Sequence, residues 1–489
     1  MLTYTFDNSQ TQPLYEQLYE KIRDDVLSGI LQSGDKLPSK RAFAQQLNIS
    51  TITIENAYQQ LVTEGYLEAR PRSGYYVAEF SVLPHRNRIL TGNEKTSEKA
   101  TGKVRGSSQL RTETEKTKWF ADFTSNQNDP ESFPFSIWAR LSREVLSTMQ
   151  DELMTNPPGE GVLILREAIA SYLRDFRGTN VTAEQVIIGA GSEYLYGRLI
   201  RLLGYDKIYA TEDPGYRTMY ETCNAYRVKC LGIHLDRKGL RADELTESGA
   251  DVVHVTPSHH FPTGITMPVT RRGQLIDWAN AKDGRYIIED DFDSELRING
   301  RILPPLSDID TEGKVIYMNT FTKSLSSTIR ISYMVLPPEL AKRYREEMAH
   351  AACPVPTFEQ YTLALFLSRG YFEKHINRMR NTSRKRRDLL LRTIDHSKLK
   401  NIVHIAEENA GLHFLMSMDL PVSGTEFVAA LKKRGLRMMS MKEYTGLEDI
   451  LKQTQIRDPG TTFIVNYSSI PEDRIEEAVR RMEECIELK

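Results

Sequence analysis

Short apolar runs alternate with helical patterns from Trp119 to about Pro337, and this alternation constrains the fold more than any other feature. Such an order is typical of a mostly parallel sheet with helices packed against it. Beyond Pro337 the pattern changes to a helix-rich α+β unit with predicted strands at residues 412–416 and 463–467. The predicted strands of the parallel sheet are residues 185–189, 207–210, 252–255, 286–289 and 315–318. We therefore expect an α/β protein.

The length of 489 residues exceeds what one hydrophobic core organises, so we expect two to four domains. The four cysteines lack metal-ligand spacing and predict reduced structural thiols. Residues 1–10 lack the basic-then-apolar order of a signal peptide, and no apolar run is long enough to cross a bilayer. These observations predict a cytoplasmic protein without a membrane partner.

Three helical patterns and two short strand patterns occupy residues 1–80. Ser39 is placed to cap the second helix, and Ser50 or Thr51 is placed to cap the third. Two strand patterns then flank a hairpin tip at residues 71–74. This order is that of a winged helix-turn-helix domain, whose recognition helix enters the major groove of DNA.

The charge of residues 1–80 does not favour DNA binding, because they hold seven Lys and Arg against ten Asp and Glu. A small helical packing module without DNA predicts the same helix spacing and stays open as an alternative. The hairpin carries Arg70 and Arg72, and these two arginines favour the DNA-binding interpretation.

Two basic stretches lie outside this module. Residues 81–118 hold nine Lys and Arg against four Glu and are poor in apolar residues, so we expect a flexible basic linker. Residues 378–387 form a basic run on a predicted helix. We interpret that run as a solvated face, with a contact to bent DNA as the alternative.

Five short motifs make the first module resemble the winged helix-turn-helix domain of the GntR family of bacterial regulators over about 70 residues. The motifs are Leu37-Pro38-Ser39-Lys40-Arg41, Ile49-Ser50-Thr51-Ile52-Thr53, Ala57-Tyr58-Gln59-Gln60-Leu61, Glu64-Gly65-Tyr66-Leu67 and Gly74-Tyr75-Tyr76-Val77. The DNA-binding residues that the resemblance implies are Ser39, Arg41, Ser50, Thr51, Thr53, Arg72 and Gly74. Family members commonly carry an arginine at the position of Thr51, so the operator sequence is not predicted from relatives.

Polar residues follow the strands of the second module, where the ligands of an α/β sheet gather. Asp290 ends one apolar run, and Lys323 follows another among small hydroxyl residues. A lysine amine forms a Schiff base with a carbonyl cofactor, and a buried acid keeps a pyridine nitrogen protonated. Ser192, Thr320 and Arg330 form the expected phosphate clamp.

The adjacent histidines His259 and His260 suggest a metal site at first sight. Adjacent histidines rarely share one ion, and no third ligand lies nearby in the sequence. The sequence therefore predicts no metal site.

Residues 119–489 resemble fold-type I aminotransferases, which depend on pyridoxal 5′-phosphate (PLP). With the first module, the full chain resembles the MocR subfamily of GntR regulators. The matching motifs are residues 289–295, residues 257–264 and Asn319-Thr320-Phe321-Thr322-Lys323. The resemblance assigns Lys323 to the internal aldimine, Asp290 to the pyridine nitrogen and Tyr216 to ring stacking. The cofactor-binding residues expected in all are Lys323, Asp290, Tyr216, Gly191, Ser192, Thr320 and Arg330.

Three departures from the aminotransferase pattern bear on catalysis. Phe292 stands where a tyrosine usually bonds the phenolic oxygen of the cofactor, and Phe261 stands where aminotransferases carry an asparagine. Thr462 aligns with the arginine that grips a substrate carboxylate, with Arg457 close by. We therefore assign no catalytic residue and expect ligand sensing instead of turnover.

The resemblance implies a winged helix-turn-helix domain (1–80), a linker (81–118) and a PLP-binding, dimerising domain (119–489). We expect a homodimer on double-stranded DNA with repeated half-sites. The leading hypothesis is a transcriptional regulator that senses PLP at Lys323 and controls a metabolic operon, such as one for vitamin B6. One alternative is an amino acid or amine sensed as an external aldimine; others are a working aminotransferase and a repressor that uses this domain only to dimerise. The regulated genes and the direction of control are not predicted.

Overall fold

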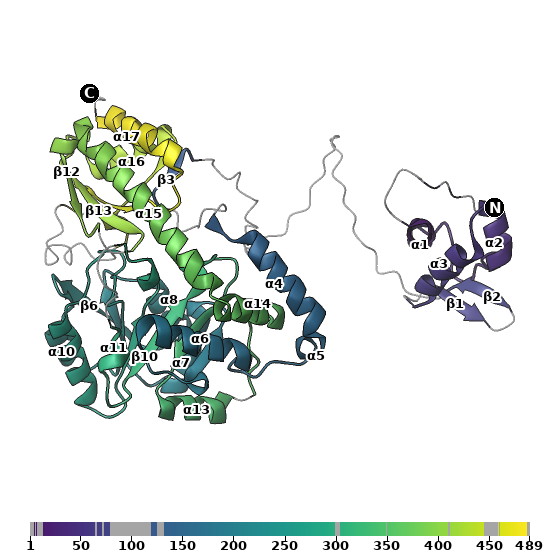
Figure 1. The fold of residues 1–489 in the computed structure, drawn as a ribbon, viewed down its shortest axis with the longest axis horizontal. Helices are drawn as coiled ribbons and strands as arrows, with labels where there is room; N and C mark the ends of the chain where they lie inside the picture. The colour runs from purple at the N-terminus through teal and green to yellow at the C-terminus, as the bar shows by residue number, and fades with distance from the viewer. Residues whose placement is uncertain are drawn as a thin grey trace, which may run out of the picture. The chain divides into compact units, whose positions relative to one another are not determined.

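The chain forms two compact units, residues 1–110 and 111–489, which we describe separately. The computed structural model describes residues 4, 6, 13–63, 66–70, 73–78, 119–124, 132–298, 304–348, 350–408, 411–444, 458 and 460–486. The predicted linker, residues 81–118, lies outside these residues. Figure 1 shows the ribbon of both units. None of the described helices is both long enough and apolar enough to span a bilayer.

The first unit consists of three helices and a two-stranded antiparallel hairpin, as the sequence predicts (Figure 1). Its elements are α1 (Leu14–Leu27), α2 (Lys40–Leu47), α3 (Thr51–Thr63), β1 (Leu67–Arg70) and β2 (Gly74–Val77). In the hairpin, Leu67 pairs with Val77 and Arg70 pairs with Gly74. The tip residues Pro71 and Arg72 lie outside the described residues.

Side-chain caps mark where α2 and α3 of the first unit begin. The Ser39 hydroxyl accepts a hydrogen bond from the Ala42 amide at 3.3 Å, and the Ser50 hydroxyl accepts one from the Thr53 amide at 3.0 Å. Both caps confirm the prediction, and Ser50 is the residue that caps α3. The inward side of α3 is fully buried against α1, α2 and the hairpin, through Ile54, Ala57, Tyr58 and Leu61.

The second unit contains an eight-stranded sheet among its described residues, in the order β4-β11-β10-β9-β8-β5-β6-β7. The strands are β4 (Val186–Gly189), β5 (Tyr209–Asp213), β6 (Cys230–Asp236), β7 (Gly239–Leu240), β8 (Val252–Val255), β9 (Tyr286–Asp290), β10 (Val315–Thr320) and β11 (Ser332–Val335). Strands β10, β9, β8, β5 and β6 are parallel, while β11 runs antiparallel to both of its neighbours. The mostly parallel sheet confirms the predicted fold class.

Helices cover both faces of this sheet. Successive strand residues point to opposite faces, and in this sheet both sets of side chains are apolar and pack against helices. In β4, Val186 and Ile188 pack into the cluster that contains α6 and α14, whereas Ile187 packs into the cluster that contains α7 and α13. The helices of this region are α4 (Phe135–Thr148), α5 (Gln150–Leu153), α6 (Leu163–Arg177), α7 (Ser192–Leu203), α8 (Arg217–Ala225), α9 (Ala242–Glu247), α10 (Val269–Asn280), α11 (Leu306–Ile309), α12 (Phe321–Ser324), α13 (Pro338–Met348) and α14 (Thr357–Ser368).

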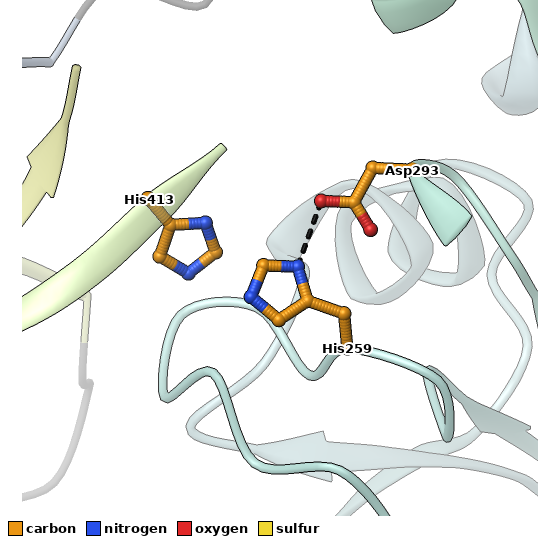
Figure 2. A group of neighbouring side chains, drawn as sticks. All are labelled: His259, Asp293 and His413. Atoms are coloured by element: carbon orange, nitrogen blue, oxygen red, sulfur yellow. Dashed lines mark hydrogen bonds and ion pairs between the residues drawn. The ribbon is translucent and has the colours of Figure 1, made fainter. Parts of the chain in front are cut away.

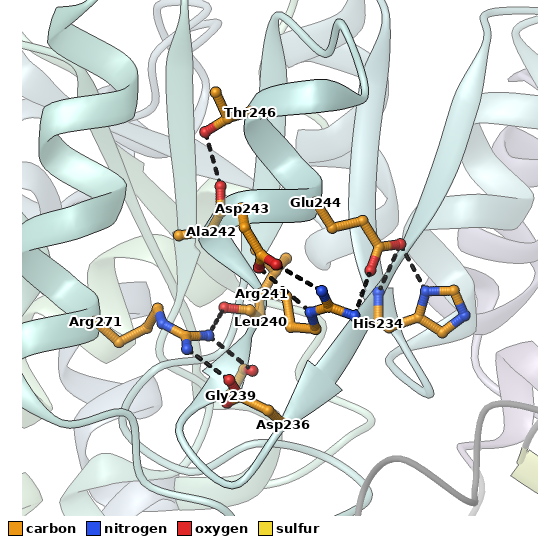
Figure 3. A network of polar contacts seen from close by, with 10 residues as sticks. All are labelled: His234, Asp236, Gly239, Leu240, Arg241, Ala242, Asp243, Glu244, Thr246 and Arg271. Carbon is orange, nitrogen blue, oxygen red and sulfur yellow. Dashed lines mark hydrogen bonds and ion pairs between the residues drawn. The ribbon is translucent and has the colours of Figure 1, made fainter.

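A buried arginine holds the edge hairpin β6–β7 against α10 (Figure 3). The Arg271 guanidinium donates to the carbonyl of Gly239 at 3.2 Å, to the carbonyl of Leu240, and to the Asp236 carboxylate at 2.6 Å. These bonds satisfy backbone acceptors at a sheet edge, where the ladder offers no partner.

The C-terminal subdomain has a four-stranded antiparallel sheet in the order β12-β13-β16-β15. Its elements are α15 (Tyr371–Asp395), β12 (Val403–Ala406), β13 (His413–Met418), α16 (Gly424–Lys433), β14 (Leu436–Arg437), β15 (Met439–Ser440), β16 (Thr462–Asn466) and α17 (Glu472–Ile486). The short strand β3 (Ala121–Asp122) pairs with β14 from far away in the sequence. The predicted α+β character of this region is therefore confirmed.

The basic run on α15 is only partly the solvated face that we predicted. Arg386 and Arg387 are buried, with 8% and 6% of their surfaces exposed. Arg380 donates to the Glu295 carbonyl at 2.5 Å, Arg384 to the Ile298 carbonyl at 2.8 Å, and Arg386 to the Ser468 carbonyl. Several of these guanidinium groups thus donate hydrogen bonds to backbone carbonyls of neighbouring segments. These bonds help to hold the second unit together.

Candidate functional site

All seven residues predicted to hold a cofactor line one cavity of about 190 Å³ in the second unit. They lie at the carboxyl ends of β4, β5, β9 and β10 or in the segments that follow these strands, with Asp290 and Thr320 as the last residues of β9 and β10. The lining consists of Gly191, Ser192, Tyr216, Asp290, Thr320, Lys323 and Arg330, together with Thr256, Phe261, Phe292 and Thr322.

One side of the cavity is built around the first turn of α7. Gly191 precedes this helix with φ of +102°, a conformation that favours glycine. A Cβ atom on Gly191 would lie 2.5 Å from Nη2 of Arg330, so the arginine occupies the space that a side chain would need. Arg330 itself has φ of +55° and donates to the Ala190 carbonyl at 3.0 Å. A helix N-terminus beside a guanidinium is suited to an anion.

Lys323 lies on the short helix α12, which Thr320 caps by accepting a hydrogen bond from the Thr322 amide at 3.2 Å. Burial lowers the pKa of Lys323 to about 8, and the negative charge of Asp293 opposes this shift. A substantial fraction of the amine is therefore neutral near pH 8, as a nucleophilic lysine requires.

Asp290 is buried at the end of β9 and belongs to a hydrogen-bonded group that the sequence did not reveal. The Tyr196 hydroxyl donates to Oδ2 of Asp290 at 2.5 Å and lies 3.0 Å from Nε2 of His254. Burial and the neighbouring Asp290 raise the pKa of Tyr196 well above its ordinary value, so the hydroxyl keeps its proton. Tyr196 follows Ser192 by one helical turn, and that spacing is the only sequence signal for its position.

Three aromatic residues that the sequence analysis singled out line the cavity. Tyr216 precedes α8 at the rim of the cavity and is 36% exposed. Phe261 and Phe292, the two departures from the aminotransferase pattern, both line the same cavity. Neither side chain can donate a hydrogen bond to a ligand.

The predicted alignment at β16 requires a correction. Thr462 is fully buried, and its hydroxyl donates to the Asp458 carbonyl at 3.0 Å, away from the cavity. Instead, Asn466 at the opposite end of β16 lines a small hollow with Lys323. Ile464 of β16 lines the same hollow, so two β16 residues, and not Thr462, face Lys323, and Arg457 lies outside the described residues. Ile464 and Asn466 are both uncharged, so the interpretation that β16 offers no arginine to this hollow is unchanged.

The same hollow brings together residues from both sheets. It is lined by Phe123, Thr124, Phe261, Phe292, Asp293, Lys323, Leu412, His413, Ile464 and Asn466. Burial lowers the pKa of His413 well below its ordinary value, and the neighbouring His259 and Lys323 add to this effect. His413 is therefore neutral at pH 7.

The residues predicted to contact DNA lie around α2, α3 and the hairpin of the first unit. Arg41 and Thr51 are exposed, whereas Thr53 is half-buried. Ser39 and Ser50 are occupied as helix caps. Gly74 begins β2 with φ of +119°, and Arg72 lies outside the described residues. Exposed residues at the start of α3 are in the position from which a recognition helix contacts bases.

Two family models match this chain. The model "Bacterial regulatory proteins, gntR family" matches residues 14–77, and the model "Aminotransferase class I and II" matches residues 120–481. Each of the two matched regions lies within one of the two compact units.

Several bacterial regulators match nearly the whole chain. The Uncharacterized HTH-type transcriptional regulator YdeL of Bacillus subtilis is 35% identical and covers 96% of each chain. The Probable rhizopine catabolism regulatory protein MocR of Rhizobium meliloti is 29% identical, over 97% of this chain and 94% of its own. The HTH-type pyridoxine biosynthesis transcriptional regulator PdxR of Corynebacterium glutamicum is 30% identical over 88% of each chain.

The second unit also matches solved aminotransferases. The crystal structure of Pyrococcus horikoshii kynurenine aminotransferase in complex with PMP has a TM-score of 0.64 and 25% identity. The match covers 76% of this chain and 92% of that chain.

Proposed function

Because this chain belongs to the MocR subfamily of GntR transcriptional regulators, we propose that it binds operator DNA and senses PLP held at Lys323. The observation that carries the proposal is the convergence of seven predicted cofactor residues on one cavity. The PdxR relative, named as a pyridoxine biosynthesis regulator, supports vitamin B6 metabolism as the controlled process.

The residues of the cavity fit PLP, the cofactor that the aminotransferase fold implies. The Arg330 guanidinium occupies the space beside Gly191 that a Cβ would fill. It therefore lies beside the start of α7, where guanidinium and helix N-terminus together could bind the phosphate. Asp290, oriented by Tyr196, would hold the pyridine nitrogen, and Tyr216 would stack on the ring. Lys323 would supply the amine for attachment. Bound PLP supplies an aldehyde that reacts with primary amines.

The lining of the cavity favours PLP itself as the signal over an amino acid. Phe261 and Phe292 donate no hydrogen bonds, and Asn466 offers no positive charge to a carboxylate. An amine without a carboxylate is the second candidate ligand, because an amine can react with the PLP aldehyde without needing that charge. Transamination of amino acids is disfavoured for the same reasons.

The DNA-binding part of the proposal rests on the exposed start of α3 and on the match of residues 14–77 to the GntR model. Residues 1–80 would contact the operator, residues 81–118 would be the tether, and residues 119–489 would bind PLP and dimerise. A homodimer would contact repeated half-sites. The DNA-binding role supports a cytoplasmic location.

The test compares the full-length protein with K323A and with the control K342A, which changes an exposed lysine on α13. We expect PLP to give a visible absorbance band that borohydride reduction converts into a permanent adduct in the wild type and K342A only. Gel shifts on the promoter DNA, with PLP and with a panel of amino acids, then measure whether each ligand changes the affinity of the protein for DNA. DNA binding that is indifferent to PLP would refute PLP sensing, and rapid transamination of a common amino acid would favour an enzyme.

A further inference from the structure

Three buried polar side chains outside the predicted cofactor set converge between the two sheets of the second unit (Figure 2). They are His259, Asp293 and His413, each no more than 5% exposed. One potential ligand atom from each residue lies within 4.8 Å of the other two. His259 and Asp293 follow β8 and β9 of the large sheet, whereas His413 begins β13 of the C-terminal sheet. The cluster thus spans both subdomains.

The cluster offers one pair of possible ligand atoms in direct contact and, among the described residues, buried imidazole nitrogens without a partner. Nδ1 of His259 lies 2.7 Å from Oδ2 of Asp293, and the ring of His413 donates to the Pro262 carbonyl. Among the described residues, Nε2 of His259 and Nε2 of His413 are buried without a hydrogen-bond partner. Figure 2 shows the two imidazole rings next to each other, with a centroid separation of 4.4 Å. An ion in place of the proton between Nδ1 of His259 and Oδ2 of Asp293 would contact both atoms, and binding to Nε2 of His413 would offset the desolvation cost of that unsatisfied nitrogen.

We propose that His259, Asp293 and His413 form a binding site for a divalent transition-metal ion, with Zn²⁺ as the best fit. Two imidazoles and one carboxylate are a common zinc ligand set, and neutral imidazole is the form that binds the ion. Tetrahedral zinc holds its ligand atoms about 3.4 Å apart, so ligand atoms that lie up to 4.8 Å apart would have to approach each other by up to about 1.4 Å. Sequence spacing gave no third ligand for the adjacent pair His259 and His260. The fold instead brings His259 together with Asp293 and His413, which lie 34 and 154 residues further along the chain.

The position of the site gives the ion a structural consequence. Because His413 belongs to the C-terminal sheet, a bound ion would connect the two subdomains directly beside Lys323. Lys323 lines the same small hollow as Asp293 and His413, so its charge lies close to the proposed ion. A positively charged Lys323 therefore opposes metal binding, whereas loss of that charge favours it.

The test measures zinc retained by the purified full-length protein after incubation with Zn²⁺ and dialysis, without PLP or DNA. We expect one Zn²⁺ per chain in the wild type and its loss in H413Q and D293N. The matched control is H404Q, which changes a histidine that is 43% exposed and paired with Asp419 on the surface. Substitution with Co²⁺ should add the visible absorption of a tetrahedral nitrogen and oxygen site in the wild type and H404Q only. Circular dichroism of each variant verifies folding, and D293N serves if H413Q fails to fold.

Two results would overturn the metal site. One is a wild-type protein that retains no zinc, which would leave only a hydrogen-bonded His259–Asp293 pair. The other is equal retention in H413Q and H404Q, which would place the ion elsewhere. A further variant, K323M, should bind Zn²⁺ more tightly than the wild type, although it loses the proposed attachment point of PLP. Zinc binding and PLP binding can therefore fail independently of each other.

Discussion

Replacing Gly191 with alanine should weaken binding of the PLP phosphate through a single steric contact. The added Cβ would lie 2.5 Å from Nη2 and 2.9 Å from Cζ of Arg330, so the guanidinium has to move. Losing one charge-assisted hydrogen bond costs about 1.5–3 kcal/mol, which corresponds to about a ten- to hundred-fold increase in Kd. The backbone at φ of +102° adds strain of about 1–3 kcal/mol to the folded state.

Two controls separate the steric effect from the strain. Gly249 also has a positive φ, of +73°, but a Cβ there would meet no atom within 4 Å. G249A should therefore lower the unfolding temperature without changing PLP affinity. Pyridoxal lacks the phosphate, so its affinity should be nearly the same in G191A and in the wild type. The assay is a titration of each ligand monitored by absorbance. If G191A weakened pyridoxal as much as PLP, or left PLP unchanged, the assignment of Arg330 to the phosphate would be wrong.

Two further substitutions test buried polar groups of the second unit. Y196F removes the hydroxyl that donates to the buried Asp290 carboxylate at 2.5 Å. The free energy of unfolding, measured by urea titration, should fall by about 1.5–3 kcal/mol. An unchanged free energy of unfolding would contradict this hydrogen bond. For Glu289, burial raises the pKa to about 7 from the ordinary 4.5, so the folded state binds this proton more tightly than the unfolded state. Its contribution to stability is therefore lost as pH rises from about 4.5 to about 7, by at most about 3 kcal/mol. E289Q mimics the protonated acid, so the stability of the variant relative to the wild type should rise over this range, and a constant difference would refute the shift.

Periodicity along the chain predicted much of the fold because the burial of one face is a local property of helices and strands. The alternation after Trp119 predicted a mostly parallel sheet, and the helix caps at Ser39 and Ser50 were correct. Three strands of the large sheet, β6, β7 and β11, were missed. The strand β6 lies near the sheet edge with alternating burial, and β11 is a four-residue antiparallel strand.

The seven cavity residues were predictable for a related reason. Each follows a strand of one sheet, and the carboxyl ends of parallel strands meet at one edge. Local motifs around Lys323 and Asp290 were therefore enough to predict which loops would meet. The partner of Asp290 was not predictable, because Tyr196 reaches it from a helix 94 residues earlier.

Contacts between the two sheets were decided only by the tertiary structure. The position of Ile464 and Asn466 beside Lys323 depends on the register of β16 against β13, whereas the sequence had placed Thr462 there. The grouping of His259, Asp293 and His413 depends on how the C-terminal sheet meets the large one. Local periodicity encodes which face of an element is buried, but not which distant element covers that face. Long-range packing therefore decided the surroundings of Lys323, whereas local sequence determined the residue itself.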